Sequence, residues 1–357
     1  MNFRKAILKQ ISILVLLLVG LALLRNMNFW VEFYGRNLYP HMAYASRIIT
    51  SFIPFSIGDF IYLYIAYYFI KLFVRFFRSR FKAYLRFVYS FLRVLNYIIF
   101  LFYLMWGLNY YTPDLQHKYN LDKQSYTLEE LESELTSQIV HINSLYQKIH
   151  AVDDSLIKFE TDKEILERQL TESYLLTTTL LDIPYYRLPS VKPSLFSYPL
   201  AYMGFSGYLN PFTGEAQYNY KGPSSSRAST ISHEIAHQLG IAPENDANFV
   251  GLVNCLLNVD PKVQFSGMLS LVSYTYSNLH AASPERAKKI IKRLNQGPLS
   301  ELKHQQKTWR KYKNPLEPMF KKGYDAYLKG NAQEQGIQSY SQFMILWLDF
   351  NKRHQLY

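Results

Sequence analysis

Residues 230–240 read TISHEIAHQLG, and this stretch sets the expected fold of the C-terminal half of the chain. Residues four apart on a helix project from the same face, so His233 and His237 can hold one metal ion between them. Glu234 lies next to His233 and can take a proton from a metal-bound water molecule. The uncharged neighbours suit a buried helix, and Gly240 supplies a helix stop. We therefore expect a helix whose histidines bind zinc and whose Glu234 is the general base of a peptide hydrolase.

A third zinc ligand is expected on the helix that follows. Asp246, Phe249, Val250 and Val253 fall at i, i+3, i+4 and i+7, which places an acid on an otherwise apolar face. Because a buried carboxylate needs a partner, we predict that Asp246 is the third ligand. Two alternatives stay open. Glu244 is the substitute candidate, or Asp246 is only a first-turn acid favoured by the helix dipole.

Transition-state stabilisation also needs a hydrogen-bond donor near the developing oxyanion. Four side chains could serve, and the sequence does not choose among them: Tyr274, Tyr276, His280 and Arg227. The only cysteine, Cys255, excludes an intramolecular disulfide. It lies in the mostly apolar run 249–259, so we expect a small buried thiol there.

The positive charge of the chain is concentrated in its N-terminal third. The 357 residues carry a net charge of +12, but residues 1–112 hold 13 Lys and Arg against the two acids Glu32 and Asp59. Residues 113–357 are nearly balanced, with 26 basic and 25 acidic side chains. Such a distribution argues against nucleic-acid binding and favours a role in membrane orientation.

Three apolar stretches in this basic region predict transmembrane helices. They cover about residues 7–24, 52–74 and 88–110, each near the roughly 20 residues that cross a bilayer. The N-terminus and the second connection carry most of the basic residues: Arg4, Lys5, Lys9, Lys71, Arg75, Arg78, Arg80, Lys82, Arg86 and Arg93. The body of the first connection has only Arg36 and Arg47. The positive-inside rule then puts residues after 111 on the far, periplasmic side.

The rest of the chain is expected to form a helical hairpin spacer, residues 113–183, and a catalytic domain, residues 184–357. Thr127 and Glu130 form a capping box for a helix to about 150, and Asp153 or Asp154 can cap a second helix over 156–181. Strands are expected at 195–198, 207–209 and 216–220, with a turn at 210–214. A strand edge there can pair with an extended substrate. Helices follow to the end of the chain, one starting at 283–285, one ending at 330–331 and one over 340–350.

Several landmarks together resemble a bacterial membrane-anchored family catalogued as a domain of unknown function. They are PFSIGD at 54–59, WGLNY at 106–110, GYLNPFTGEA at 207–216, residues 233–240, DANF at 246–249, and Gly336-x-x-Ser339-Tyr340. The resemblance implies three spans followed by a zincin-like domain, in a bacterial inner membrane, and it brings no established substrate. The expected fold is mainly α with a small β-sheet, comprising three transmembrane helices (residues 1–112) and a zincin-like α+β metallopeptidase domain.

The leading hypothesis is a membrane-anchored zinc metallopeptidase that hydrolyses peptide bonds on the periplasmic side. Its expected cofactor is zinc, and its expected partners are a peptide or protein substrate and the lipid bilayer. The competing hypothesis is a non-catalytic membrane protein whose zinc site is structural and which acts as a binding or envelope scaffold module. A structural zinc site normally has four protein ligands and does not need Glu234.

Overall fold

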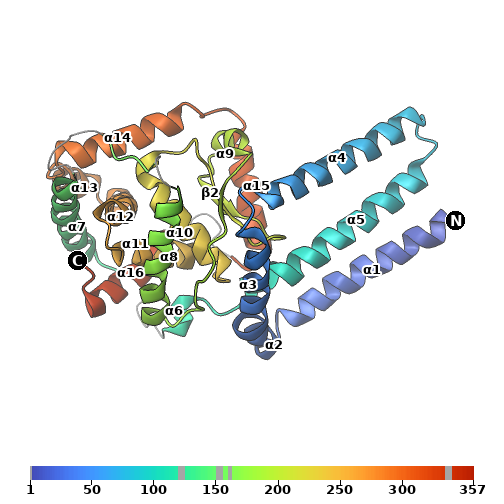
Figure 1. Cartoon of the computed structure of the whole chain (residues 1–357), viewed down its shortest axis with the longest axis horizontal. Coiled ribbons are helices and arrows are strands. Elements are labelled where there is room, and N and C mark those ends of the chain that lie inside the picture. Colours follow the sequence, from blue (N-terminus) through green and yellow to red (C-terminus); the bar gives the residue numbers. More distant parts are fainter. Residues whose placement is uncertain (1, 120–124, 150–155, 160–162, 334–339) are drawn as a thin grey trace.

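Two parts of the chain are visible in the computed structural model, which describes residues 2–119, 125–149, 156–159, 163–333 and 340–357. Three long helices project from a larger body of helices that holds a small three-stranded sheet (Figure 1). The predicted fold class, mainly α with a small β-sheet, is confirmed at this level.

The three projecting helices are α1 (Phe3–Leu24), α4 (Ile57–Arg78) and α5 (Tyr84–Met105), and each is long and apolar enough to cross a membrane. Each has 22 residues, so at 1.5 Å per residue each is about 33 Å long. They run side by side, and α1 packs against α5, where the Asn96 side chain donates a 3.0 Å hydrogen bond to the Gln10 carbonyl (Figure 1). The three stretches predicted as spans are confirmed as helices, but α1 and α5 begin four residues earlier than expected and α4 begins five residues later.

The connection between the first two spans is helical and belongs to the body. It comprises α2 (Asn28–Phe33), the π-helical turn η1 (Tyr34–Leu38) and α3 (Tyr39–Thr50). The Arg47 guanidinium is buried and donates to the carbonyls of Gln238, at 3.1 Å, and Arg187, at 3.2 Å. This connection therefore lies at the same end of the spans as the body. The basic turn between α4 and α5 lies at the opposite end (Figure 1).

The expected spacer is part of the main hydrophobic core. The capping box is confirmed, since Thr127 N–H donates to Glu130 Oε2 (2.8 Å) and Glu130 N–H donates to Thr127 Oγ1 (3.1 Å). The helix it starts, α7 (Leu128–Ile149), packs on α12 (Pro261–Ala282), and α8 (Lys163–Leu180) packs on α11 (Glu244–Leu256). Leucines of both helices share one core with the metal-motif helix, so residues 113–183 do not form a separate spacer. The predicted caps Asp153 and Asp154 lie outside the described residues.

The sheet has the strand order β1-β3-β2, with β2 at one edge. Strand β1 (Val191–Pro193) pairs in parallel with β3 (Ala216–Tyr218), and β2 (Gly207–Leu209) pairs antiparallel to β3. The predicted strands at 207–209 and 216–220 are confirmed, the second ending at Tyr218 instead of 220. So is the turn between them, in which Gly214 has φ +63° and donates to the Asn210 carbonyl at 2.9 Å.

The strand predicted at 195–198 is wrong. Ser197 begins helix α9 (Ser197–Met203) instead. Pro199 suits the first turn of a helix, where a missing N–H costs nothing. Ser197, Leu200 and Ala201 form the buried face of this helix. A short apolar run of this kind has no periodicity that separates a strand from a helix.

Two buried acids join the sheet to the start of α4. Glu215 accepts the backbone N–H groups of Ile57 (3.0 Å) and Gly58 (2.6 Å), at the N-terminus of the helix. In return, Asp59 accepts the Leu195 N–H at 2.7 Å and the Tyr208 hydroxyl. Both carboxylates are 0 % exposed, so the edge strand β2 is fixed to the beginning of α4, a candidate membrane-spanning helix.

The C-terminal part is helical as predicted. The expected helix start at 283–285 and the expected end at 330–331 are confirmed, and the last apolar helix is present. The elements are α13 (Pro284–Ile291), α14 (Gln296–Arg310), α15 (Glu317–Gly330) and α16 (Tyr340–His354). Helix α15 lies between the body and the near ends of α4 and α5 (Figure 1). The landmark residues Gly336 and Ser339 lie outside the described residues.

Candidate metal centre

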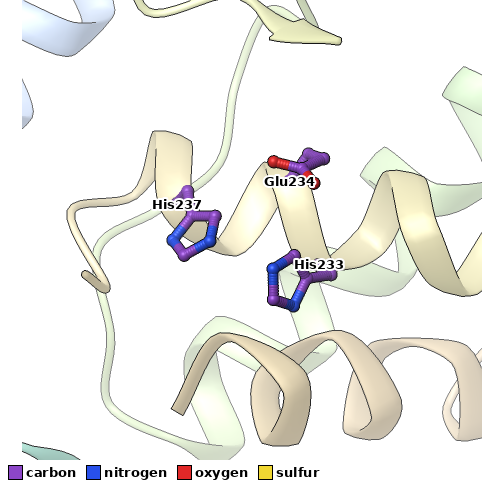
Figure 2. Close-up of side chains that lie close together, drawn as sticks. All are labelled: His233, Glu234 and His237. Atoms are coloured by element: carbon purple, nitrogen blue, oxygen red, sulfur yellow. The ribbon is translucent and has the colours of Figure 1, made fainter. Parts of the chain in front are cut away.

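The HEIAH motif lies on α10 (Arg227–Gln238), a helix that is buried along most of its length. The imidazole rings of His233 and His237 lie on the same side of the helix, with centroids 4.6 Å apart (Figure 2). Gly240 ends the helix in the left-handed region, at φ +90°, and a Cβ there would lie 2.8 Å from the Tyr39 ring. The predicted helix, its stop and the facing histidines are therefore all present.

Helix α11 approaches α10 closely at Gly251. A Cβ on this glycine would lie 2.8 Å from the backbone nitrogen of His233, so a larger residue would push the two helices apart. The close approach brings Glu244, at the start of α11, to both histidines. Glu244 Oε2 lies 3.3 Å from His233 Nε2, and Oε1 lies 3.7 Å from His237 Nε2. One carboxylate thus faces both imidazoles.

The position predicted for Asp246 is wrong, and the alternative Glu244 occupies it. Asp246 points to the other side of α11, where its Oδ2 accepts the Leu115 backbone N–H at 2.8 Å. This bond supplies the partner that a buried carboxylate needs. The apolar pattern predicts the wrong ligand because α11 is buried on nearly all sides. Its most apolar face therefore does not mark the side that faces the histidines. Glu244 and Asn248, four residues apart, mark that side instead.

Burial and mutual charge shift the pKa values of four side chains. The pKa is raised for Glu234 and His233 and lowered for Glu244 and His237. Burial raises the pKa of Glu234 to about 8, with His233 opposing and Glu244 adding to the shift. Burial alone would raise the pKa of Glu244, but the hydrogen bond and charge of His233 and the charge of His237 hold it at about 2. Burial lowers the pKa of His237 to about 4, and His233 adds to this. Burial alone would lower the pKa of His233, but Glu244 and Glu234 raise it above its ordinary value.

Neighbouring groups orient the potential ligands. His237 Nδ1 lies 2.7 Å from the Ile241 carbonyl, so this nitrogen donates and leaves the Nε2 lone pair facing Glu244. The Tyr324 hydroxyl donates to Glu244 Oε1 at 2.7 Å. Metal-ligating side chains usually have such partners, which fix both the tautomer and the orientation of the ligand.

Glu234 lies under the edge strand of the sheet. Its side chain is 4 % exposed, and a Cβ on Gly207 would lie 2.6 Å from its Oε1. Within the described part of the chain, Glu234 Oε2 is buried and has no hydrogen-bond partner. Potential ligand atoms of His233, Glu234 and His237 all lie within 4.8 Å of one another. The described residues thus supply no partner for one oxygen of this buried carboxylate, which suits a group that transfers a proton.

These donors fit a zinc ion. Two imidazole Nε2 atoms and one carboxylate are a ligand set that catalytic zinc sites use, and the unpartnered Glu234 oxygen beside them suits the base that acts there. A cation would also offset the cost of burying two carboxylates so close together. The chemistry of the site is thus consistent with the predicted zinc cofactor, and zinc binding stays a prediction.

A cleft of about 900 Å³ opens over the motif. Besides residues of α9, α12, α14 and α16, its walls come from helices α10 and α11, the edge strand β2, the residues that follow α5, and helix α15. Aromatic side chains dominate the last two: Trp106, Tyr110, Tyr324 and Tyr327. The site is therefore assembled partly from residues at the end of α5, one of the three candidate membrane-spanning helices.

Of the four predicted oxyanion donors, only Tyr274 is among the residues that line this cleft. Tyr276 packs on His280, with ring centroids 5.5 Å apart, and the Arg227 guanidinium lies over the Tyr218 ring at 5.6 Å. Sequence reasoning missed Tyr324, which lies 80 residues beyond Glu244. No motif links these two positions in the sequence. Cys255 is buried, as expected.

Comparison with known proteins identifies a family and no activity. A family described as "Protein of unknown function (DUF3810)" matches residues 34–348, which is most of the chain. The chain belongs to this family. No curated protein and no solved structure matches it. The predicted membership of a family of unknown function is therefore confirmed, and the zincin-like character of the domain stays a prediction.

Proposed function

We propose that this member of the DUF3810 family is a membrane-anchored zinc metallopeptidase that hydrolyses peptide bonds outside the cytoplasm. The observation that carries the proposal is the meeting of Glu244 with both motif histidines, at 3.3 and 3.7 Å, in the cleft beside Glu234. His233, His237 and Glu244 would hold the ion. Bound zinc would supply Lewis-acid activation of water and of the scissile carbonyl.

The chain's own groups account for the remaining chemistry. Strand β2 is the edge of the sheet and its residues line the cleft, so its free edge can pair with an extended substrate backbone. A substrate bound in this way passes directly over Glu234, against which Gly207 is packed. Glu234 then accepts a proton from the attacking water and delivers it to the leaving amine nitrogen. Tyr324 keeps Glu244 in position through its hydrogen bond.

The proposed location is the periplasmic side of a bacterial inner membrane. The body and the α2–α3 connection lie at one end of the spans, and the basic turn between α4 and α5 lies at the other (Figure 1). Arg75, Arg78, Arg80 and Lys82 are at that basic end. Under the positive-inside rule the basic end is cytoplasmic, which puts the cleft outside.

The test uses the purified full-length chain with a matched pair of variants. Glu234→Gln changes the proposed base, and Glu285→Gln changes an exposed glutamate at the start of α13. We expect one zinc per chain in all three proteins by elemental analysis. Cleavage of a mixed peptide library, followed by mass spectrometry, should drop by roughly 10²- to 10⁴-fold only in Glu234→Gln. Bound zinc without hydrolysis by the wild type would support the structural or scaffold role instead.

A further inference from the structure

The membrane-facing wall of the cleft indicates which polypeptides can reach the site, and this inference rests on the proposed peptidase function. Helix α5 ends at Met105, and its length of about 33 Å matches a hydrocarbon core of about 30 Å. The next residue, Trp106, lies edge-on to the His237 ring, with centroids 5.8 Å apart. A proposed zinc ligand is therefore in contact with the first residue beyond a membrane span.

A second span reaches the same cleft from another direction. Asp59, in the first turn of α4, accepts the hydroxyl of Tyr208 on β2. The ring of Tyr62, one turn further along α4, lies 6.3 Å from the Tyr208 ring between centroids. The strand edge that would bind substrate thus lies at the level where α4 enters the membrane. The contacts at the end of α5 and at the start of α4 therefore place the site at the same depth relative to the membrane.

Helix α15 closes the cleft on the membrane side. Tyr327 on this helix shares a 3.1 Å hydrogen bond with Tyr110, which follows α5, and the Tyr103 hydroxyl of α5 donates to Asn331 Oδ1 at 3.1 Å. Leu316, just before α15, and Met319, in its first turn, are 55 % and 60 % exposed. Helix α15 is therefore held to the end of α5 near its own C-terminus and carries exposed apolar residues at its start.

The lining of the cleft matches the residues found at a membrane interface. Tyrosine and tryptophan are enriched where membrane proteins leave the bilayer. The cleft presents the same aromatic types from four parts of the chain, together with the cation Lys321: Trp106, Tyr110, Tyr208, Trp309, Tyr324 and Tyr327. Side chains that flank a span would find apolar and cation–π contacts on these rings.

We propose that the substrate is an extended segment of another membrane protein that leaves the bilayer directly before the cleavage site. Because an extended chain advances about 3.3 Å per residue, the scissile bond lies within roughly ten residues of the substrate's own span. The chain on one side of that bond remains anchored in the membrane. A folded soluble protein cannot bring a loop to the strand edge without contacting the bilayer.

The test compares one set of sequences at different distances from a membrane. The full-length chain with zinc is co-reconstituted in phosphatidylethanolamine/phosphatidylglycerol vesicles with single-span reporters that carry a randomised ten-residue segment. The segment either follows the span directly or is separated from it by a 30-residue Gly/Ser linker, and a third set presents the same segments as soluble peptides. Mass spectrometry gives the cleaved sequences and their rates, with Glu234→Gln as the blank.

We expect the segments next to the span to be cleaved at least tenfold faster than the linked or soluble forms. Equal rates in all three sets would overturn the inference about the substrate and leave the peptidase function standing. Faster cleavage of the soluble set would also overturn it. Absence of cleavage in every set, with zinc bound, would overturn the proposed function and the inference together.

Discussion

The Tyr324 hydroxyl donates a 2.7 Å hydrogen bond to Oε1 of Glu244, the same oxygen that lies 3.7 Å from His237 Nε2. Tyr324 lies on α15, and Glu244 lies on α11. The hydrogen bond therefore ties the membrane-side wall of the cleft to the proposed metal centre. A side chain near the end of the sequence sets the position of a ligand in its middle.

Removing this hydrogen bond should weaken zinc binding without abolishing it. We expect Tyr324→Phe to lower the zinc affinity by roughly 10- to 100-fold, because a ligand that loses its orienting partner moves more freely. Competition with a chromophoric chelator measures the affinity. Tyr276→Phe is the matched control, since Tyr276 packs against His280 and is not among the residues that line the cleft. Equal affinities in the two variants would contradict the orienting role.

The identity of the third ligand can be tested in the same assay. We expect Glu244→Ala to lower the zinc affinity by more than roughly 100-fold, as removal of a ligand costs more than removal of its partner. Asp246→Asn should bind zinc nearly as well as the wild type, because Asp246 bonds to the Leu115 backbone instead. Loss of zinc in Asp246→Asn, with Glu244→Ala unaffected, would restore the assignment made from the helix pattern.

Zinc affinity should fall as the pH is lowered. Glu244 and Glu234 outweigh burial and raise the pKa of His233 above its ordinary 6.5. A proton on His233 competes with the ion, so affinity is full above the raised pKa and decreases by about tenfold per pH unit below it. Titrations at several values between about pH 8 and pH 6 test this. In Glu244→Gln the decrease should begin at a lower pH, since the carboxylate that raises the pKa is gone.

The contacts between the sheet and α4 should contribute to stability. Glu215→Gln removes a buried charge that accepts two backbone N–H groups of α4 and the Thr213 hydroxyl, at 2.8 Å. We expect a cost of about 3 kcal/mol and a melting temperature lower by about 6 °C in detergent. Glu172→Gln, on an exposed position of α8, is the control and should melt like the wild type. A wild-type melting temperature for Glu215→Gln would show that the carboxylate is not needed there.

Membrane orientation can be read with reporter fusions. A fusion after Arg80 should report the cytoplasm, because this residue lies in the basic turn between α4 and α5. A fusion after Asp114, which precedes the body, should report the periplasm. A cytoplasmic signal at Asp114 would reverse the proposed orientation and place the cleft inside the cell.

The three long apolar helices and the start of α7 show what local sequence predicts well. Long apolar stretches and a capping box depend on neighbours in the chain, so the three spans and the start of α7 followed directly from it. The strand predicted at 195–198 failed, because a four-residue apolar run has no decisive period. The expected spacer failed for a different reason. The apolar faces of α7 and α8 are visible in the sequence. The sequence does not show that α12 covers the first and α11 covers the second.

The residues of the candidate metal centre also differ in how well the sequence predicts them. His233 and His237 are set by the geometry of a single helix, and their facing rings were predicted. The third group depends on how two helices cross, which Gly251 decides by allowing its helix to touch the backbone of His233. An isolated glycine does not reveal its neighbour in space, so the helix pattern favours Asp246 although Glu244 lies closer to the histidines.

The buried carboxylates Asp59 and Glu215 couple the start of α4 to the strand edge, so that the two elements move together. A helix that spans the membrane tilts when the thickness of the hydrocarbon layer changes. Because α4 and β2 are held together at Tyr208, a tilt of one must rotate the other. With α4 spanning a membrane as proposed, the lipid composition around the protein would therefore affect the angle at which the cleft meets a substrate.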